Sequence, residues 1–289
     1  MMMIAMLSFV ANDAMMKYVF QEISVEQGIL IRGSIAVPIL ILIAYFRKSL
    51  FVNIDRRNWR AILIRAIAEM VSTITFLTAL SHMPLANITA ILQSLPLTVT
   101  MFAALFLGET VRWRRWAAII IGFCGVLIII RPSGEGFDSY AILALVTVMI
   151  ITIRDVVTRK IDKSVPSLFV ALISAIPVCF YAGGMTVYNG WTPLGDTTWL
   201  AMGGAALAIT SGYLFAVMAM RNGDISFVTP FRYTGMVWAI LFGFLLFGNL
   251  PDQTTVLGTL IVVGMGVYSF HRERINQKKA NKDKAGANS

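Results

Sequence analysis

Residues 27–60 read QGILIRGSIAVPILILIAYF followed by RKSLFVNIDRRNWR. The first twenty residues are almost entirely apolar. An α-helix of about 20 residues, at about 1.5 Å per residue, crosses a hydrocarbon core roughly 30 Å thick. The second part carries five Lys or Arg side chains. A membrane-spanning helix followed by a basic loop is the pattern that the rest of the chain repeats.

Apolar stretches of this length recur along the whole chain. They predict ten transmembrane helices, at 2–20, 27–46, 60–80, 85–107, 114–131, 138–157, 166–188, 197–219, 226–248 and 254–271. The chain is 57% hydrophobic and 13% charged, with a mean hydropathy of +0.76, whereas about a quarter of the residues of soluble domains carry charge. The sequence therefore predicts an all-α, multi-pass integral membrane protein whose first partner is the lipid bilayer.

The net charge of +9 is concentrated in alternate loops and in the tail. Lys and Arg follow predicted helices 2, 4, 6, 8 and 10, whereas the loops 21–26, 81–84, 132–137, 189–196 and 249–253 contain neither. This pattern is the positive-inside rule, which predicts a protein of the cell inner membrane with both termini cytoplasmic. The basic charge therefore indicates topology, and we expect no nucleic-acid partner.

The two halves of the chain resemble each other at an offset of about 140 residues. Matched pairs include Trp59 with Trp199, Thr89 with Thr229, Gly108 with Gly248, and the triplet at 12–14 with the triplet at 154–156. Each half holds five helices, an odd number, so the second half is inverted in the membrane. We expect repeats at 1–131 and 132–272 and a disordered basic cytoplasmic tail at 273–289. Inverted repeats place a substrate site near the bilayer midplane.

Residues 92–109, LQSLPLTVTMFAALFLGE, followed by Trp116 and by IGFCGVLIII at 121–130, resemble the EamA family of the drug/metabolite transporter superfamily. A looser second copy follows Pro230 and carries Asn249 where the family has an acid. The resemblance implies a central cavity lined mainly by helices 1, 3, 4, 6, 8 and 9. It also implies transport of a metabolite such as an amino acid, amine, nucleoside, S-adenosylmethionine or riboflavin, without choosing among them.

Charged residues inside the predicted helices are the candidate site residues, because a charge at a helix centre costs about 2.5 to 3.5 kcal/mol. Glu69 lies halfway along helix 60–80, and Arg65 lies one turn before it, where an i,i+4 pair forms. Glu69 is either a midplane carboxylate that takes up a proton or an amine, or part of a pair that fixes packing. Arg232 suits a substrate carboxylate or phosphate, with a salt bridge to Glu69 or another acid as the alternative.

Polar and aromatic residues in the two halves extend this candidate substrate site. Tyr233, just after Thr229 and Pro230, matches Gln93 by the repeat offset, so two polar residues lie at similar depths in the two halves. Trp238 lies deep enough to stack on a planar substrate.

Arg32 is a further candidate ligand residue, with snorkelling or a structural ion pair as the alternative. Asp13 is a second candidate for proton coupling beside Glu69, and Lys17 one turn later predicts another i,i+4 pair. The neighbouring Asn12 and the corresponding pair Arg154-Asp155 also allow a repeated structural arrangement.

These residues favour a secondary transporter that moves a small metabolite by alternating access. Intramembrane cations outnumber acids, which favours an amino-acid-like or carboxylate-bearing substrate over a hydrophobic cation; a vitamin or nucleoside is the other class. Uptake of riboflavin or S-adenosylmethionine specifically and metabolite export are alternatives. A membrane-embedded enzyme is a distant one, because it needs a nucleophile with a base, a metal cluster or paired carboxylates. We therefore expect no catalytic residues, metal or cofactor, while the option of a homodimer stays open.

Overall fold

The computed structural model describes residues 1–50, 52, 54–109, 111–131, 139–162, 164–222 and 228–286, without the side chains of residues 217, 220–222, 229 and 276–286. Throughout these ranges the regular secondary structure is helical. The elements are α1 (Met2–Val19), α2 (Val25–Phe46), α3 (Arg56–His82), α4 (Leu85–Leu92), α5 (Leu95–Phe106), α6 (Trp113–Ile130), α7 (Ser139–Thr158), α8 (Ser167–Asn189), α9 (Asp196–Asn222), the 3-10 helix η1 (Thr229–Tyr233), α11 (Thr234–Phe247) and α12 (Gln253–Gly286).

The helices make the ten predicted crossings, since α4 and α5 share one crossing and η1 and α11 share another. Within the described ranges, nine of these crossings are long and apolar enough to span a membrane. The tenth, α1, contains Asn12, Asp13 and Lys17, which lower its hydropathy. The predicted fold class is confirmed. The division at residues 131 and 272 stays a prediction, and α12 continues as helix to Gly286, where the sequence predicts a disordered tail.

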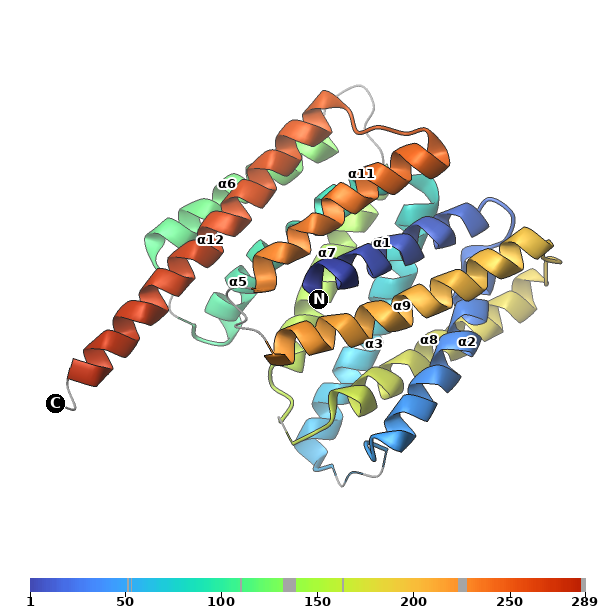
Figure 1. Ribbon diagram of the computed structural model, residues 1–289, viewed down its shortest axis with the longest axis horizontal. Helices are drawn as coiled ribbons and strands as arrows, with labels where there is room; N and C mark the ends of the chain where they lie inside the picture. Colours follow the sequence, from blue (N-terminus) through green and yellow to red (C-terminus); the bar gives the residue numbers. More distant parts are fainter. Residues whose placement is uncertain are drawn as a thin grey trace.

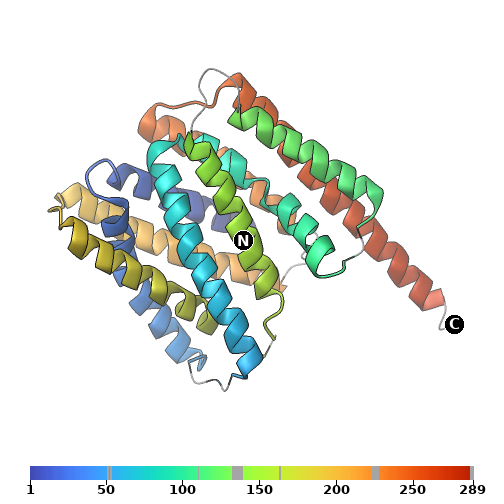
Figure 2. The ribbon, with the colours of Figure 1, turned by 180° about the vertical axis from the view of Figure 1, so that it is seen from behind.

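The two repeats are intertwined rather than side by side. In Figure 1 the near face shows α1 between α9 and α11, and Figure 2 shows α3 and α7 crossing the opposite face. Helix α1 packs against α9 and α11, while α7, its counterpart in the second repeat, packs against α3 and α5. The pairs α2–α8 and α6–α12 lie at opposite edges of the bundle. The contacts of α1 with α9 and α11 thus have their counterparts in the contacts of α7 with α3 and α5, as two related repeats require.

Two of the crossings depart from a continuous α-helix at matching positions of the repeats. The sequence predicted continuous helices at 85–107 and 226–248, but the first is interrupted at Gln93 and the second begins as η1. Pro96 and Pro230 each lack a backbone donor, which favours the interruption. The breaks meet where Gln93 Nε2 donates to the carbonyl oxygen of Tyr233 at 3.4 Å. Polar backbone groups are tolerated inside a membrane where they face protein, as they do here.

Helices α6 and α12 form a close pair fixed near both ends. A Cβ atom on Gly258 would lie 2.6 Å from the carbonyl oxygen of Gly125, so the backbones approach as near as glycine allows. Arg115 binds Glu273 at 3.1 Å at one end, and Arg131 binds Asp252 at the other. Burial alone would raise the pKa of the Asp252 carboxyl, but hydrogen bonds from residue 255 and Arg131 outweigh it and lower the pKa to about 2.

Candidate functional site

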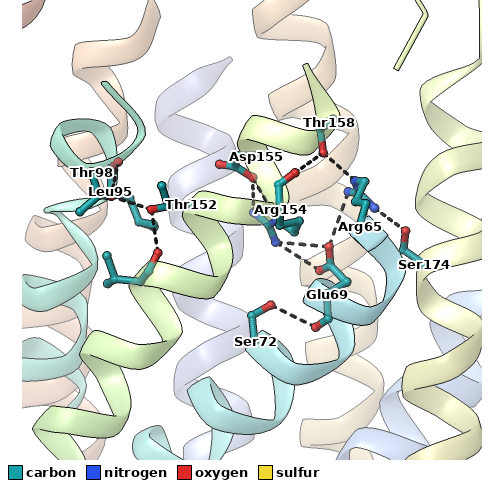
Figure 3. A network of polar contacts seen from close by, with 11 residues as sticks. Arg65, Glu69, Ser72, Leu95, Thr98, Thr152, Arg154, Asp155, Thr158 and Ser174 are labelled. Carbon is teal, nitrogen blue, oxygen red and sulfur yellow. Dashed lines mark hydrogen bonds and ion pairs between the residues drawn. The ribbon is translucent and has the colours of Figure 1, made fainter. Parts of the chain in front are cut away.

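Glu69 lies at the centre of a charged network between α3 and α7 (Figure 3). Arg65 Nη2 lies 3.5 Å from Glu69 Oε2, which confirms the expected i,i+4 contact. Arg154 Nη1 lies 3.3 Å from both carboxylate oxygens. The arginine in turn holds Asp155, with its Nε atom 3.0 Å from Oδ1. One carboxylate near the middle of α3 therefore carries two guanidinium groups from two helices, which we call the Glu69 cluster: Arg65, Glu69, Arg154 and Asp155.

Hydroxyl groups on α7 and α8 fix the geometry of this cluster. Arg65 Nε donates to Thr158 Oγ1 at 3.0 Å, and a second nitrogen of Arg65 donates to the buried Ser174. A separate hydroxyl pair, Thr98 and Thr152 at 2.7 Å, ties α5 to α7 beside it (Figure 3). The Glu69 and Arg154 side chains are 15% and 21% exposed. The cluster is therefore held by short side-chain contacts yet stays partly accessible.

A second group of polar side chains lies on α1 and α2. Asn12 Nδ2 donates to Asp13 Oδ1 at 2.9 Å, and Arg32 Nη1 lies 3.4 Å from Asn12 Oδ1. We call Asn12, Asp13 and Arg32 the Arg32 group. Tyr213 on α9 interacts electrostatically with both Glu69 and Arg32, and Arg32 interacts with Glu69. The two sets of charges are therefore within electrostatic reach of each other in the membrane interior.

The repeat relates the two sets of side chains. The offset matches Asn12-Asp13 with Arg154-Asp155, and in both the first side chain donates to the carboxylate of the aspartate that follows. The partners then differ: Arg154 reaches an acid on α3, whereas Asn12 reaches an arginine on α2. The prediction of a repeated local arrangement is thus confirmed in its geometry, with different charges in the two halves.

Lys17 does not form the predicted pair with Asp13. Its ammonium group donates to the carbonyl oxygens of Leu80 at 2.9 Å and Met83 at 2.7 Å, at the C-terminal end of α3. It also lies 5.7 Å from the ring centre of Phe247. A cation at a helix C-terminus satisfies free carbonyl groups and the helix dipole, which is a better environment than one carboxylate a turn away.

The remaining candidates lie away from the Glu69 cluster. Tyr233 is buried against Gly266 of α12, and its hydroxyl has no hydrogen-bond partner among the described residues. Trp238 is half-buried, and its ring nitrogen likewise lacks a described acceptor. Arg232 is exposed on η1, and the alternative of a salt bridge to Glu69 is wrong, since Glu69 pairs with Arg65 and Arg154. The side chain of Thr229 lies outside the described residues.

Three participants were missed by sequence reasoning as members of this site. Arg154 and Asp155 lie near one end of α7 and were interpreted only as a local pair; their match to Asn12-Asp13 was the usable indication. Tyr213 could not be predicted as a site residue, because a single tyrosine in an apolar helix forms no spacing pattern with other polar residues. Among the described residues, no three His, Cys, Asp or Glu side chains gather as metal ligands.

Ten crossings in two intertwined repeats, with broken helices meeting at mid-depth and charges gathered inside the membrane, define a membrane transporter of the inverted-repeat class. The model of the EamA-like transporter family matches residues 1–131 and 138–269. The chain belongs to this family, which confirms the predicted family and its two-repeat architecture.

Several curated relatives span nearly the same length as this chain. The S-adenosylmethionine uptake transporter of Rickettsia felis is 22% identical over 94% of this chain and 92% of its own length. The riboflavin transporter of Vibrio cholerae is 25% identical over 91% and 89%, and the pseudopaline exporter CntI of Pseudomonas aeruginosa is 23% identical over 90% and 91%. A crystal structure with 17% identity shares the fold, with a TM-score of 0.66 over 95% of this chain and 97% of the other.

Proposed function

We propose that the chain moves a small metabolite across the cell inner membrane by alternating access, with the solute bound between the Glu69 cluster and the Arg32 group. The observation that carries the proposal is the gathering of ionisable side chains from α1, α2, α3 and α7 in the membrane interior, with Tyr213 of α9 interacting with them. Such charges are costly there and mark substrate or ion pathways. A protein that needed only packing would avoid them.

The packing supports a rocking movement around this position. Helices α1, α9 and α11 pack together on one side, and α3, α5 and α7 pack together on the other. Lys17 joins the two sides at one end through the last turn of α3. Release of this contact would open that end, while the broken helices near Gln93 and Tyr233 keep the sides in register. The basic loops favour an orientation with both termini in the cytoplasm, and in that orientation Lys17 lies toward the outer surface.

The relatives suggest which solutes to test first. One relative is named for uptake of S-adenosylmethionine, another for riboflavin transport, and a third for pseudopaline export. The two arginines around Glu69 and the further cation Arg32 favour a solute with a carboxylate over a hydrophobic cation. S-adenosylmethionine and amino-acid-like solutes are therefore the first candidates, with riboflavin as the neutral alternative.

Binding is testable by thermal unfolding of the detergent-purified protein with a panel of solutes. The panel contains amino acids, organic acids, nucleosides, riboflavin and S-adenosylmethionine. A solute at 100 times its Kd adds about 2.7 kcal/mol to the free energy of unfolding, so a binder raises the unfolding midpoint. We expect a carboxylate-bearing solute to do so in the wild type and not in Arg32→Met. Equal stabilisation of both proteins would contradict the proposed location of the site.

A further inference from the structure

The described residues offer few hydrogen-bond acceptors to the Arg32 side chain. Its guanidinium carries five N–H donors, yet its contact with the described residues is a single one, to Asn12 Oδ1 at 3.4 Å. No carboxylate of the described residues lies within ion-pair distance of Arg32. Lys17 also has no carboxylate partner among them, but its ammonium group donates to two backbone carbonyl groups instead. Most N–H donors of Arg32 therefore have no acceptor among the described residues, although the side chain lies inside the membrane.

Two other arginines inside the membrane, Arg154 and Arg65, provide a comparison for Arg32. Arg154 lies 2.9 Å from Asp155 Oδ1 and 3.3 Å from Glu69 Oε2, so its charge is met by two carboxylates. Arg65 shares Glu69 and has two hydroxyl acceptors besides. The same fold can therefore saturate an arginine inside the membrane. The shortage of acceptors around Arg32 therefore needs a separate explanation.

The Asp13 carboxyl group likewise has few hydrogen-bond partners among the described residues. Its described contact is the donor Nδ2 of Asn12 at 2.9 Å. The buried Asn12 amide presents its oxygen to Arg32 and its nitrogen to Asp13. Arg32 and Asp13 interact electrostatically, but the amide between them keeps the two charges from closing into a direct ion pair. A guanidinium and a carboxyl group are thereby held apart, each with hydrogen-bonding capacity that the described residues do not use.

We propose that Arg32 and Asp13 bind the two charged ends of a zwitterionic substrate, the carboxylate on Arg32 and the ammonium group on Asp13. The inference rests on the proposed transport function and names its substrate class. Guanidinium and carboxylate groups form two parallel hydrogen bonds, and an ammonium group matches an aspartate. A zwitterion satisfies both protein charges without adding net charge to the membrane interior, whereas a simple anion leaves Asp13 unmatched.

Tyr213 and Phe9 lie beside this pair of charges. Tyr213 interacts electrostatically with Arg32, and its ring meets the Phe9 ring edge-on at 5.4 Å. Tyr213 is 41% exposed and also interacts electrostatically with charged groups of α3 and α7. The uncharged part of an amino-acid-like substrate would contact these two rings.

A first experiment needs no ligand and compares two matched variants, Arg32→Met and Arg154→Met. An arginine kept for substrate loses only one long contact, to Asn12, so we expect the unfolding midpoint of purified Arg32→Met to equal or exceed that of the wild type. Arg154→Met removes a partner of Glu69 and Asp155, and its midpoint should fall by at least about 5 °C. A fall of similar size in Arg32→Met would overturn the proposal, because Arg32 would then be structural.

A second experiment tests the substrate class with matched chemical probes. Apolar and aromatic α-amino acids and S-adenosylmethionine are compared with their N-acetyl derivatives, which lack the ammonium group, and their amides, which lack the carboxylate. We expect a parent zwitterion to raise the unfolding midpoint, neither derivative to do so, and Arg32→Met and Asp13→Asn to abolish the effect.

Other outcomes separate this inference from the transport function. Stabilisation by none of the zwitterions, or equally by their derivatives, would contradict the zwitterion site. If riboflavin or another uncharged solute is bound and carried into proteoliposomes, transport stands and the zwitterion inference fails. If a zwitterion binds but is never carried, the site stands and the proposed transport fails.

Discussion

Replacing Glu69 with glutamine is expected to reduce transport at least tenfold and to lower the stability of the protein. The substitution leaves Arg65 without a carboxylate and Arg154 with Asp155 alone. Removing one partner of a buried ion pair costs about 3–5 kcal/mol, and partial exposure of this cluster reduces that to about 2 kcal/mol. A tenfold loss of rate corresponds to about 1.4 kcal/mol. The measurements are the unfolding midpoint and the initial flux of the bound solute into proteoliposomes.

Glu109→Gln is the matched control for this substitution. Glu109 also binds an arginine, Arg159, at 3.0 Å, but both side chains are nearly half exposed. Exposed ion pairs contribute about 0–1 kcal/mol, so the control should keep the wild-type midpoint and flux. Wild-type flux in Glu69→Gln, at normal protein yield, would show that the Glu69 cluster takes no part in transport.

Replacing Lys17 with methionine is expected to open the end of the bundle where α1 meets α3. The substitution keeps an unbranched side chain, one atom shorter, and removes both hydrogen bonds to the last turn of α3. A hydrogen bond to a charged group contributes about 1.5–3 kcal/mol, which is enough to shift an equilibrium between open and closed forms about tenfold or more. Ala79, fully buried on α3 near these carbonyl groups, should become accessible.

The measurement is the rate at which a membrane-impermeant maleimide labels Ala79→Cys from the outer side in intact cells. Cys124 and Cys179 are replaced by serine beforehand, since they are the chain's two native cysteines. We expect faster labelling with Lys17→Met and no change with Lys160→Met, which alters an exposed lysine at the opposite end. Equal labelling rates in all three proteins would show that Lys17 does not hold this end closed.

The crossings and repeats could be predicted from the sequence because each depends on local composition. Twenty apolar residues must span the membrane, and an odd number of crossings inverts the second half. The pair Arg65–Glu69 was predictable for the same reason, since helical spacing alone brings the side chains together. Gln93 was expected to match Tyr233 in depth, and the structure brings these residues into direct contact.

The partners across helices could not be predicted in this way. Lys17 was assigned to Asp13 by spacing, but the end of α3 offers two carbonyl groups from residues more than 60 positions away. Arg232 was favoured for its chemistry, yet η1 leaves it exposed. Arg154 meets Glu69 because α7 packs on α3, which no local pattern reports. The charged network therefore depends on tertiary packing that single-helix periodicity does not contain.

Solute exchange in proteoliposomes tests the central claim most directly. Vesicles that hold the purified protein are loaded with unlabelled solute, and entry of the labelled solute is followed from outside. Alternating access predicts that internal solute accelerates entry in the wild type, and that Glu69→Gln and Arg32→Met abolish this acceleration. Entry at the same rate with and without internal solute, insensitive to both substitutions, would contradict a carrier whose site lies between the Glu69 cluster and the Arg32 group.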